Sequence, residues 1–95
     1  MENKIDLSNF VNVLTIEQCK CDLTNRFKQR RKEIGYSQKE LAQRSDVSYA
    51  SIRRFEAMGE ISLISLLKLS HALGILHEFT QLFATPLGKN LKDIK

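Results

Sequence analysis

The stretch from residue 37 to residue 56 combines a helix start with a run of turn formers, which limits how the chain can fold. Ser37 and the glutamate three residues later form a capping box, which begins a helix. Residues 45–48 (SDVS) then interrupt the helical pattern, because Asp46 tolerates left-handed backbone geometry and Ser48 favours a new helix start. We therefore expect two short helices joined by a tight turn instead of one amphipathic helix.

Capping residues and glycines mark three further helices. Thr15 begins a capping box before a helix expected over Ile16–Ile34, and Gly35 suits the position after its end. The helix that starts at Ser48 ends at Gly59, a fourth runs from Ser62 to Gly74, and a short fifth covers His77–Phe83. Apolar residues of the last two helices are assigned to the core: Leu63, Leu66, Leu67, Phe79 and Phe83. The expected fold class is all-α, a compact bundle of about five helices.

The chain has 95 residues, which is enough for one domain with a modest core. We divide it into an N-terminal arm (residues 1–14), a helical domain (residues 15–84) and a C-terminal tail (residues 85–95). The arm contains apolar residues without a clear period, so we expect it to dock either on the domain or on a partner.

Basic residues are concentrated in one part of the chain. The formal net charge is +4, and the segment from Lys20 to Arg54 contains ten basic and four acidic residues. Such a block on a small domain favours an anionic partner, either nucleic acid or, less often, a membrane surface. The alternative is a set of helix faces that are simply solvated, and composition alone does not decide between the two.

Several classes of function are not indicated. The two cysteines, Cys19 and Cys21, point to different sides of a helix and both histidines lie far away, so no metal site is expected. No nucleophile–base set or phosphate-binding loop is readable, so we expect neither an enzyme nor a cofactor. No apolar run approaches the ~20 residues that span a bilayer, and no secretory signal is present, so we expect a cytoplasmic protein without membrane contact.

The segment around the expected turn has the side chains that two crossed helices need. Ala42 is small enough for a close approach of the helices, and Val47 fills the space beneath the turn. Ile52 and Phe55 form one buried stripe on the second helix. With these positions the chain resembles the lambda-repressor-like (XRE/Cro) family of helix-turn-helix DNA-binding proteins, in which the second helix is the recognition helix. The resemblance covers residues 23–75 and rests on Arg31, residues 35–38 (GYSQ), Leu41, Ala42, Val47, Ser48, Ile52, Phe55, Glu56, Gly59, Leu66, Leu67 and residues 72–74 (ALG).

Two positions depart from the family pattern. Asp46 stands where the family usually has glycine, but aspartate can adopt the required backbone conformation at some cost. The loop after the recognition helix usually contacts phosphate in this family, whereas Glu60 would repel it. The resemblance therefore implies an intact turn and leaves the contribution of this loop open.

The resemblance also implies DNA-binding roles for particular residues. Three would face base edges in the major groove, where arginine bonds guanine and a methyl group contacts thymine: Tyr49, Ala50 and Arg54. Three would lie at phosphates: Gln38, Ser48 and Ser51. Arg53 would reach either a base or the flanking backbone, and further phosphate contacts are expected from Lys39, Arg26 and Arg30. Arg31 and Glu56 would form a structural ion pair, and Tyr49 has the alternative of packing against a neighbouring chain.

The implied function is that of a transcriptional regulator, a repressor that binds an inverted-repeat operator in double-stranded DNA as a homodimer and is associated with the nucleoid. We expect the dimer surface to include Phe10, Val11, Phe79 and Phe83, which exceed what so small a core must hold. The alternative is a HipB-like antitoxin of a type II toxin–antitoxin pair, which binds a HipA-type kinase toxin and represses its own operon. Residues 55–63 (FEAMGEISL) and the end of the fifth helix carry this second resemblance. RNA binding is less favoured, because the side chains suit a groove-entering helix better than base stacking.

Overall fold

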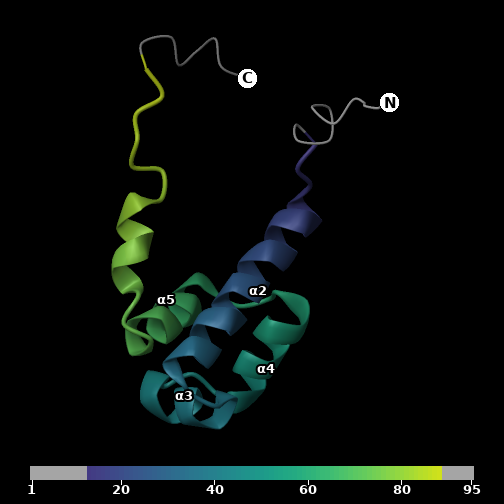
Figure 1. Ribbon diagram of the computed structural model, residues 1–95, viewed down its shortest axis with the longest axis vertical. Coiled ribbons are helices and arrows are strands. Elements are labelled where there is room, and N and C mark those ends of the chain that lie inside the picture. Colours follow the sequence, from purple (N-terminus) through teal and green to yellow (C-terminus); the bar gives the residue numbers. More distant parts are fainter. Residues whose placement is uncertain (1–12, 89–95) are drawn as a thin grey trace.

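The structure is a computed structural model that describes residues 13–88 of the chain (Figure 1). Within this range the chain forms four α-helices and one 3-10 helix: α2 (Ile16–Ile34), α3 (Gln38–Ser45), α4 (Tyr49–Met58), α5 (Leu63–Ala72) and η1 (Leu76–Gln81). The all-α bundle predicted from the sequence is therefore confirmed. The predicted arm and tail, residues 1–14 and 85–95, fall mostly outside the described residues.

Each α-helix begins at a serine or threonine whose side chain accepts a hydrogen bond from a backbone N–H three residues later. The four pairs have oxygen–nitrogen distances of 2.9–3.1 Å: Thr15–Gln18, Ser37–Glu40, Ser48–Ser51 and Ser62–Ser65. At the start of α3 the carboxylate of Glu40 also accepts from the backbone N–H of Ser37, which completes the predicted capping box. These caps supply partners to N–H groups that a helix start leaves unpaired, and they fix where each helix begins.

The turn between α3 and α4 depends on Asp46. Its backbone is left-handed, with φ of 63° and ψ of 29°, a conformation that aspartate adopts more readily than most residues. Val47 follows and is only 5% exposed, because its side chain belongs to the core. The predicted turn is therefore present, and Val47 anchors it.

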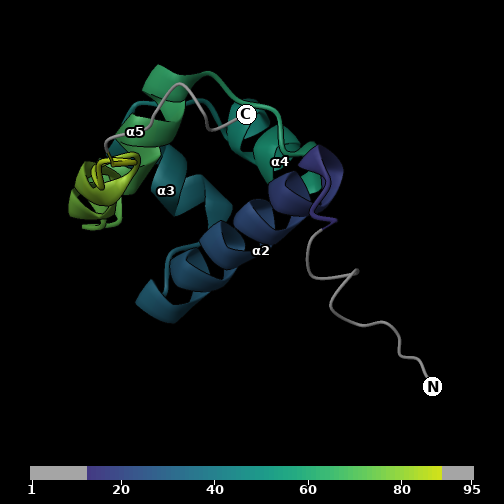
Figure 2. The ribbon, with the colours of Figure 1, turned by 90° about the horizontal axis from the view of Figure 1, so that it is seen from above.

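A single core holds the helices together. Its buried apolar residues are Phe27, Leu41, Val47, Ile52, Phe55, Leu69 and Leu73. The rings of Phe27 in α2 and Phe55 in α4 meet edge to face, with their centroids 5.1 Å apart. α3 lies between α4 and α5 and packs against both (Figure 2). The core thus fixes α4 against α2 and α3, and the opposite side of α4 is exposed to solvent.

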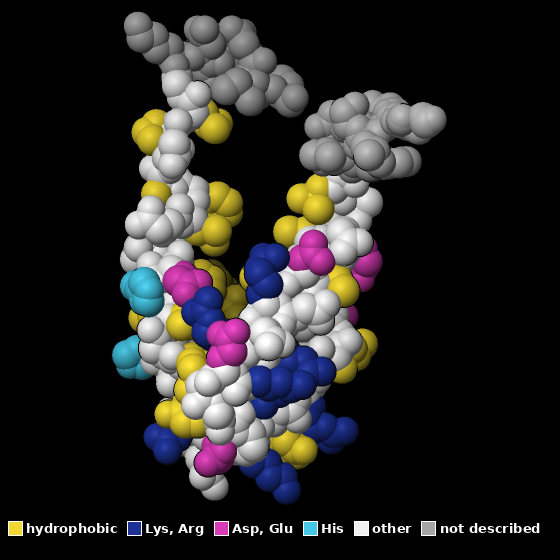
Figure 3. All heavy atoms as spheres, viewed as in Figure 1, with side chains coloured by type: hydrophobic (Ala, Val, Ile, Leu, Met, Phe, Trp, Pro, Cys, Tyr) yellow, Lys and Arg dark blue, Asp and Glu magenta, His cyan; other side chains and the backbone are white. Residues whose placement is uncertain are grey.

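The N-terminal half of α2 and the segment from η1 to residue 88 extend from the same side of the core (Figure 1). Apolar side chains gather on the facing sides of these two extensions (Figure 3). Between them lies a groove of about 240 Å³ whose apolar lining includes Leu23, Phe27, Phe79 and Leu82. We call this the α2–η1 groove.

Two parts of the predicted core are wrong. Phe83 is 95% exposed and Leu63 is 68% exposed, although the sequence pattern assigns both to the core. The last helix is a 3-10 helix that ends at Gln81, because the extended backbone of Leu82 (φ −66°, ψ 125°) stops it before Phe83. Leu63 is the first residue of α5 and lies at the exposed end of that helix.

Candidate nucleic-acid interface

A buried ion pair sets the position of α4 against α2. Arg31 donates through Nε and Nη2 to the two carboxylate oxygens of Glu56, at 2.7 and 2.8 Å. Its third nitrogen, Nη1, donates to the backbone carbonyl of Tyr36 at 2.8 Å, in the loop before α3. The side chains of Arg31 and Glu56 are only 8% and 3% exposed. The structural pair expected from the sequence is therefore present, and it joins α2, α4 and the intervening loop.

The surroundings of Glu56 favour its ionised form. Burial by itself raises the pKa of Glu56, but hydrogen bonds donated by Arg31 and Gln38 outweigh this effect and hold the pKa below its ordinary value of 4.5. The carboxylate therefore carries a negative charge at neutral pH and serves as the common acceptor for α2 and α3.

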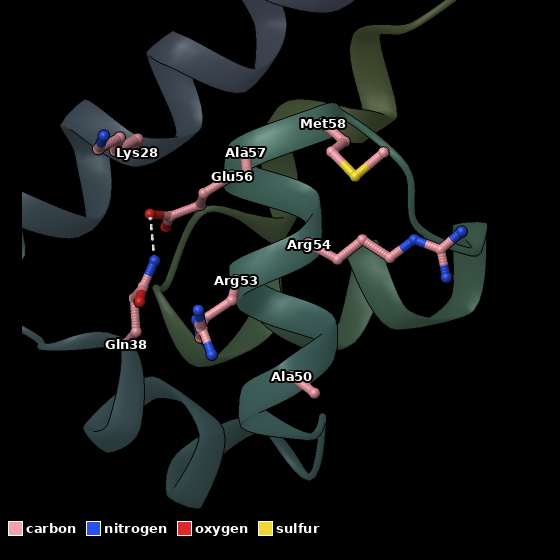
Figure 4. A pocket seen from close by; sticks show the side chains of 8 residues that line it. All are labelled: Lys28, Gln38, Ala50, Arg53, Arg54, Glu56, Ala57 and Met58. Carbon is pink, nitrogen blue, oxygen red and sulfur yellow. Dashed lines mark hydrogen bonds between the residues drawn. The ribbon is translucent and has the colours of Figure 1, made fainter.

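Gln38, the first residue of α3, is held by this carboxylate. Its Nε2 donates to Oε1 of Glu56 at 2.9 Å, and Figure 4 shows the two side chains turned toward each other. An amide nitrogen has two N–H donors, so one remains for a ligand near the start of α3. A helix start also attracts anions, because its first N–H groups point outward without partners in the helix.

The exposed face of α4, as we define it, consists of Tyr49, Ala50, Arg53 and Arg54. On the opposite side of the helix Ile52 and Phe55 are 0% and 2% exposed, which separates the two faces clearly. Ser51 is half-buried, and its Oγ accepts a hydrogen bond of 2.8 Å from Oγ of Ser48. One surface therefore carries four of the residues predicted to contact DNA. Two others, Ser48 and Ser51, lie at the N-terminal end of the same helix.

Tyr49 brings two basic residues together at the start of α4. Nζ of Lys39 lies 5.5 Å from the centroid of the Tyr49 ring, and the guanidinium carbon of Arg53 lies 5.6 Å from it. Both distances are within the range of cation–π attraction. The ring thus collects one cation from α3 and one from α4 at the same edge of the molecule.

A hollow beside α4 gathers residues from three helices (Figure 4). It measures about 470 Å³ and is lined by Lys28, Gln38, Ala50, Arg53, Arg54, Glu56, Ala57 and Met58. Lys28, Ala57 and Met58 are not among the site residues predicted from the sequence. Lys28 precedes Arg31 by three positions on α2, so helical spacing could have placed it on the side of α2 that faces α4.

Arg54 points away from Arg53, its neighbour on the exposed face (Figure 4). Figure 4 shows the side chains of Arg53 and Arg54 leaving α4 in different directions. Nη2 of Arg54 donates to Oε1 of Glu60 at 2.8 Å, in the loop between α4 and α5. The side chains of Arg54 and Glu60 are 65% and 48% exposed, so the two form a surface ion pair. This contact was missed in the sequence because it depends on the path of the loop.

Arg26 and Arg30, which were predicted to contact phosphate, line the α2–η1 groove instead. Nη1 of Arg30 donates to Oε2 of Glu78 at 2.6 Å, and this hydrogen bond holds the pKa of Glu78 below its ordinary value. Their positions on α2 turn both arginines toward η1. The structure therefore does not bring them together with the exposed face of α4.

Residues 13–88 contain no group of three or more His, Cys, Asp and Glu side chains that could hold a metal ion. None of the helices formed by these residues is long and apolar enough to cross a membrane.

Residues 27–79 match a family model described as Helix-turn-helix. This range is more than half of the 95-residue chain and includes all of α3, α4 and α5. It also contains the Arg31–Glu56 pair, the exposed face of α4 and Glu60. No curated protein and no solved structure matches the chain.

Proposed function

The chain belongs to the XRE-type helix-turn-helix family of DNA-binding regulatory domains, and we propose that it is a sequence-specific transcriptional repressor that binds its operator as a dimer. The observation that carries this proposal is the exposed face of α4, where Arg53 and Arg54 stand outside while Ile52 and Phe55 lie in the core. An α-helix with its side chains is about 10–12 Å across and fits the major groove of B-DNA, which is about 12 Å wide. In this proposal α4 is the recognition helix.

We assign the reading of sequence to three residues on the exposed face of α4: Arg54, Ala50 and Tyr49. Arg54 can bond O6 and N7 of a guanine at the same time, and the methyl group of Ala50 can contact a thymine methyl. Tyr49 starts the helix next to these two and offers a hydroxyl to a neighbouring base edge. These three side chains together specify a half-site of only a few base pairs.

Phosphates on either side of the groove fix the position of the helix. The side chains that we assign to them are Gln38, Lys39, Ser48, Ser51 and Arg53, with Lys28 added by its place in the hollow beside α4. These contacts carry no sequence information themselves but set the orientation of α4 in the groove.

A dimer solves the problem that one recognition helix reads too little sequence. Two copies placed in successive major grooves, about 34 Å apart, would read an inverted repeat. We assign the dimer surface to the α2–η1 groove and the residues beyond it, because Leu23, Leu82 and Phe83 are 44%, 56% and 95% exposed there. Phe10 and Val11, which were also expected at this surface, lie outside the described residues.

The test is selection of binding sites from random duplex DNA, followed by footprinting with the full chain. Arg54→Ala should weaken binding by about 1–3 kcal/mol per half-site and relax the preference at one base pair in each half. Lys39→Ala should weaken binding to all sequences about equally, because a phosphate contact does not discriminate. Failure to select any sequence, or a preference that Arg54→Ala leaves intact, would contradict the proposal.

A second candidate function is that of an antitoxin that binds a HipA-type kinase toxin and represses its own operon. It is supported by the apolar side chains exposed after η1, among which Leu82 and Leu87 are 56% and 69% exposed. Exposed apolar patches of this kind often mark protein-binding surfaces. Co-expression with a kinase-like protein encoded next to this chain, with kinase activity as the readout, separates the two candidates. Inhibition that Leu82→Lys abolishes supports the antitoxin, and a stable dimer that leaves the kinase active supports the repressor alone.

A further inference from the structure

We infer that Glu60 is a specificity-determining residue: it restrains Arg54 in the free protein and, because operator binding must break this restraint, it weakens binding to the operator more than binding to nonspecific DNA. The inference rests on the proposed function, because it requires that Arg54 contacts DNA from the recognition helix. Its basis is the 2.8 Å hydrogen bond from Nη2 of Arg54 to Oε1 of Glu60. Within the described residues the neighbouring Arg53 makes no ion pair, so the restraint applies to one of the two adjacent arginines.

The direction of the Arg54 side chain is the first step of the argument. Figure 4 shows it leaving α4 on the side of the loop that leads to α5, whereas Arg53 leaves the helix on the other side. Arg54 and Glu60 border a hollow of about 340 Å³, which is also lined by Ser51, Ile61, Ser62 and Ser65. In the free protein, therefore, the pair with Glu60 holds the guanidinium of Arg54 over the loop between α4 and α5.

The strength of the pair is the second step. The side chains of Arg54 and Glu60 are 65% and 48% exposed, and ion pairs between exposed groups contribute little to stability. A ligand that offers Arg54 a better arrangement of acceptors can therefore release it. The pair is strong enough to orient a free side chain and weak enough to open on binding.

The position of Glu60 relative to bound DNA is the third step. When α4 fills the major groove, the residues that flank it approach the sugar–phosphate backbone, since the groove is scarcely wider than the helix. Glu60 follows the end of α4 by two residues, and its carboxylate would then face phosphates of the same charge. At physiological salt, charges closer than about 8 Å still repel each other appreciably.

These steps predict different outcomes on the two kinds of DNA. On nonspecific DNA Arg54 can gain only a phosphate, which offers little over its present anionic partner, so the pair with Glu60 can stay closed while Glu60 repels the backbone. At the operator Arg54 gains two acceptors on one guanine in a fixed geometry, which favours opening the pair. Glu60 thus lowers affinity for all DNA through repulsion, and lowers affinity for the operator further because the pair must open there.

The experiment compares wild type with Glu60→Gln on two labelled duplexes of equal length, the selected site and a scrambled sequence, at several salt concentrations. Glu60→Gln should raise affinity for the selected site by about fivefold and for the scrambled duplex by no more than about twofold, because it removes phosphate repulsion on both duplexes but removes a restraint that only operator binding has to break. The matched control is Glu33→Gln, which removes the same charge from an exposed glutamate of α2 that lies 3.7 Å from Arg30. This control should change both affinities by the same small factor.

A second pair of variants shows whether Glu60 acts through Arg54. In an Arg54→Gln background, Glu60→Gln should no longer change the ratio of the two affinities. A ratio of selected-site to scrambled affinity that still rises in this background would mean that Glu60 discriminates without Arg54 and would overturn the inference. Equal gains on both duplexes in the wild-type background would overturn it too, while leaving the proposed function intact. If the wild-type protein binds neither duplex, both the inference and the proposed function are contradicted.

Discussion

Arg31 and Glu56 are 25 residues apart in sequence, yet two nitrogens of the guanidinium lie 2.7 and 2.8 Å from the two carboxylate oxygens. The third nitrogen reaches the carbonyl of Tyr36, so every nitrogen of Arg31 has an acceptor. Because both side chains are almost fully buried, the pair cannot be replaced by water without opening the fold. The orientation of α4 and of the start of α3 therefore depends on one residue of α2.

We expect Arg31→Ala to lower the free energy of unfolding by about 3 kcal/mol, because it leaves the buried carboxylate of Glu56 without its main partner. Urea unfolding of the variant measures this loss, and Lys32→Ala, at an exposed neighbouring position, is the control. The double variant Arg31→Ala with Glu56→Ala should lose less than the sum of the two single variants, since no unpaired charge remains. An unchanged stability together with an altered base preference would assign Arg31 to DNA contact instead.

The same pair predicts how stability depends on pH. The pKa of Glu56 in the folded protein lies below its ordinary value of 4.5, so the ionised carboxylate stabilises the fold above that pH. This contribution should be lost as the pH falls through the lowered pKa. We therefore expect the free energy of unfolding to drop as the pH falls below about 4.5, and to drop less in Glu56→Gln. Urea unfolding at a series of pH values checks this, and identical pH slopes for the two proteins would contradict it.

Features that depend on neighbouring residues in the chain could be predicted from the sequence. The helix starts at Ser37 and Ser48 and the left-handed turn at Asp46 follow from capping and backbone preferences, which act over a few residues. The buried stripe of Ile52 and Phe55 follows from helical spacing.

Contacts across the fold could not be predicted in the same way. Glu78 lies 48 residues from Arg30, and nothing local in the sequence shows that it becomes the partner of this arginine. The bond between Arg54 and Glu60 depends on how the loop after α4 turns, and the bond between Gln38 and Glu56 depends on how α3 packs on α4. The sequence therefore identifies most of the candidate site residues but not the partners that orient them.

Gly59 should tolerate substitution less well than Gly74. Both have a left-handed backbone, with φ of 74° and 76°, so alanine is strained at either position. At Gly59 an added Cβ would also lie 2.6 Å from Cγ of Lys20 and 3.1 Å from Oγ1 of Thr24, whereas nothing lies within 4 Å at Gly74. We expect Gly59→Ala to lower the free energy of unfolding by about 2–3 kcal/mol and Gly74→Ala by about 1 kcal/mol. Equal losses in urea unfolding would show that α2 yields to the added methyl group.

Salt should weaken DNA binding in a way that reports individual phosphate contacts. The logarithm of affinity is expected to fall linearly with the logarithm of salt concentration, with a slope of about −0.9 for each phosphate neutralised. Lys39→Ala should make this slope shallower by about 1, because Lys39 stands beside Tyr49 at the start of the recognition helix. Lys68→Ala serves as the control, since Lys68 lies on α5 and pairs at 3.8 Å with Asp46. A slope that neither substitution changes would place the phosphate contacts elsewhere.

Leu82→Lys should separate the proposed dimer, because it places a charge in the apolar lining of the α2–η1 groove. A stable interface buries about 800 Å² on each partner, and a lysine in the middle of it would lose hydration without gaining a partner. The control is Leu63→Lys, at a side chain that is also highly exposed but does not line the groove. Sedimentation equilibrium of the free protein should show dimers for wild type and Leu63→Lys and monomers for Leu82→Lys. Footprinting on the inverted repeat should show that Leu82→Lys protects only one half-site. A dimer that survives Leu82→Lys would move the interface away from this groove, and a wild-type monomer that protects a single half-site would contradict the dimer itself.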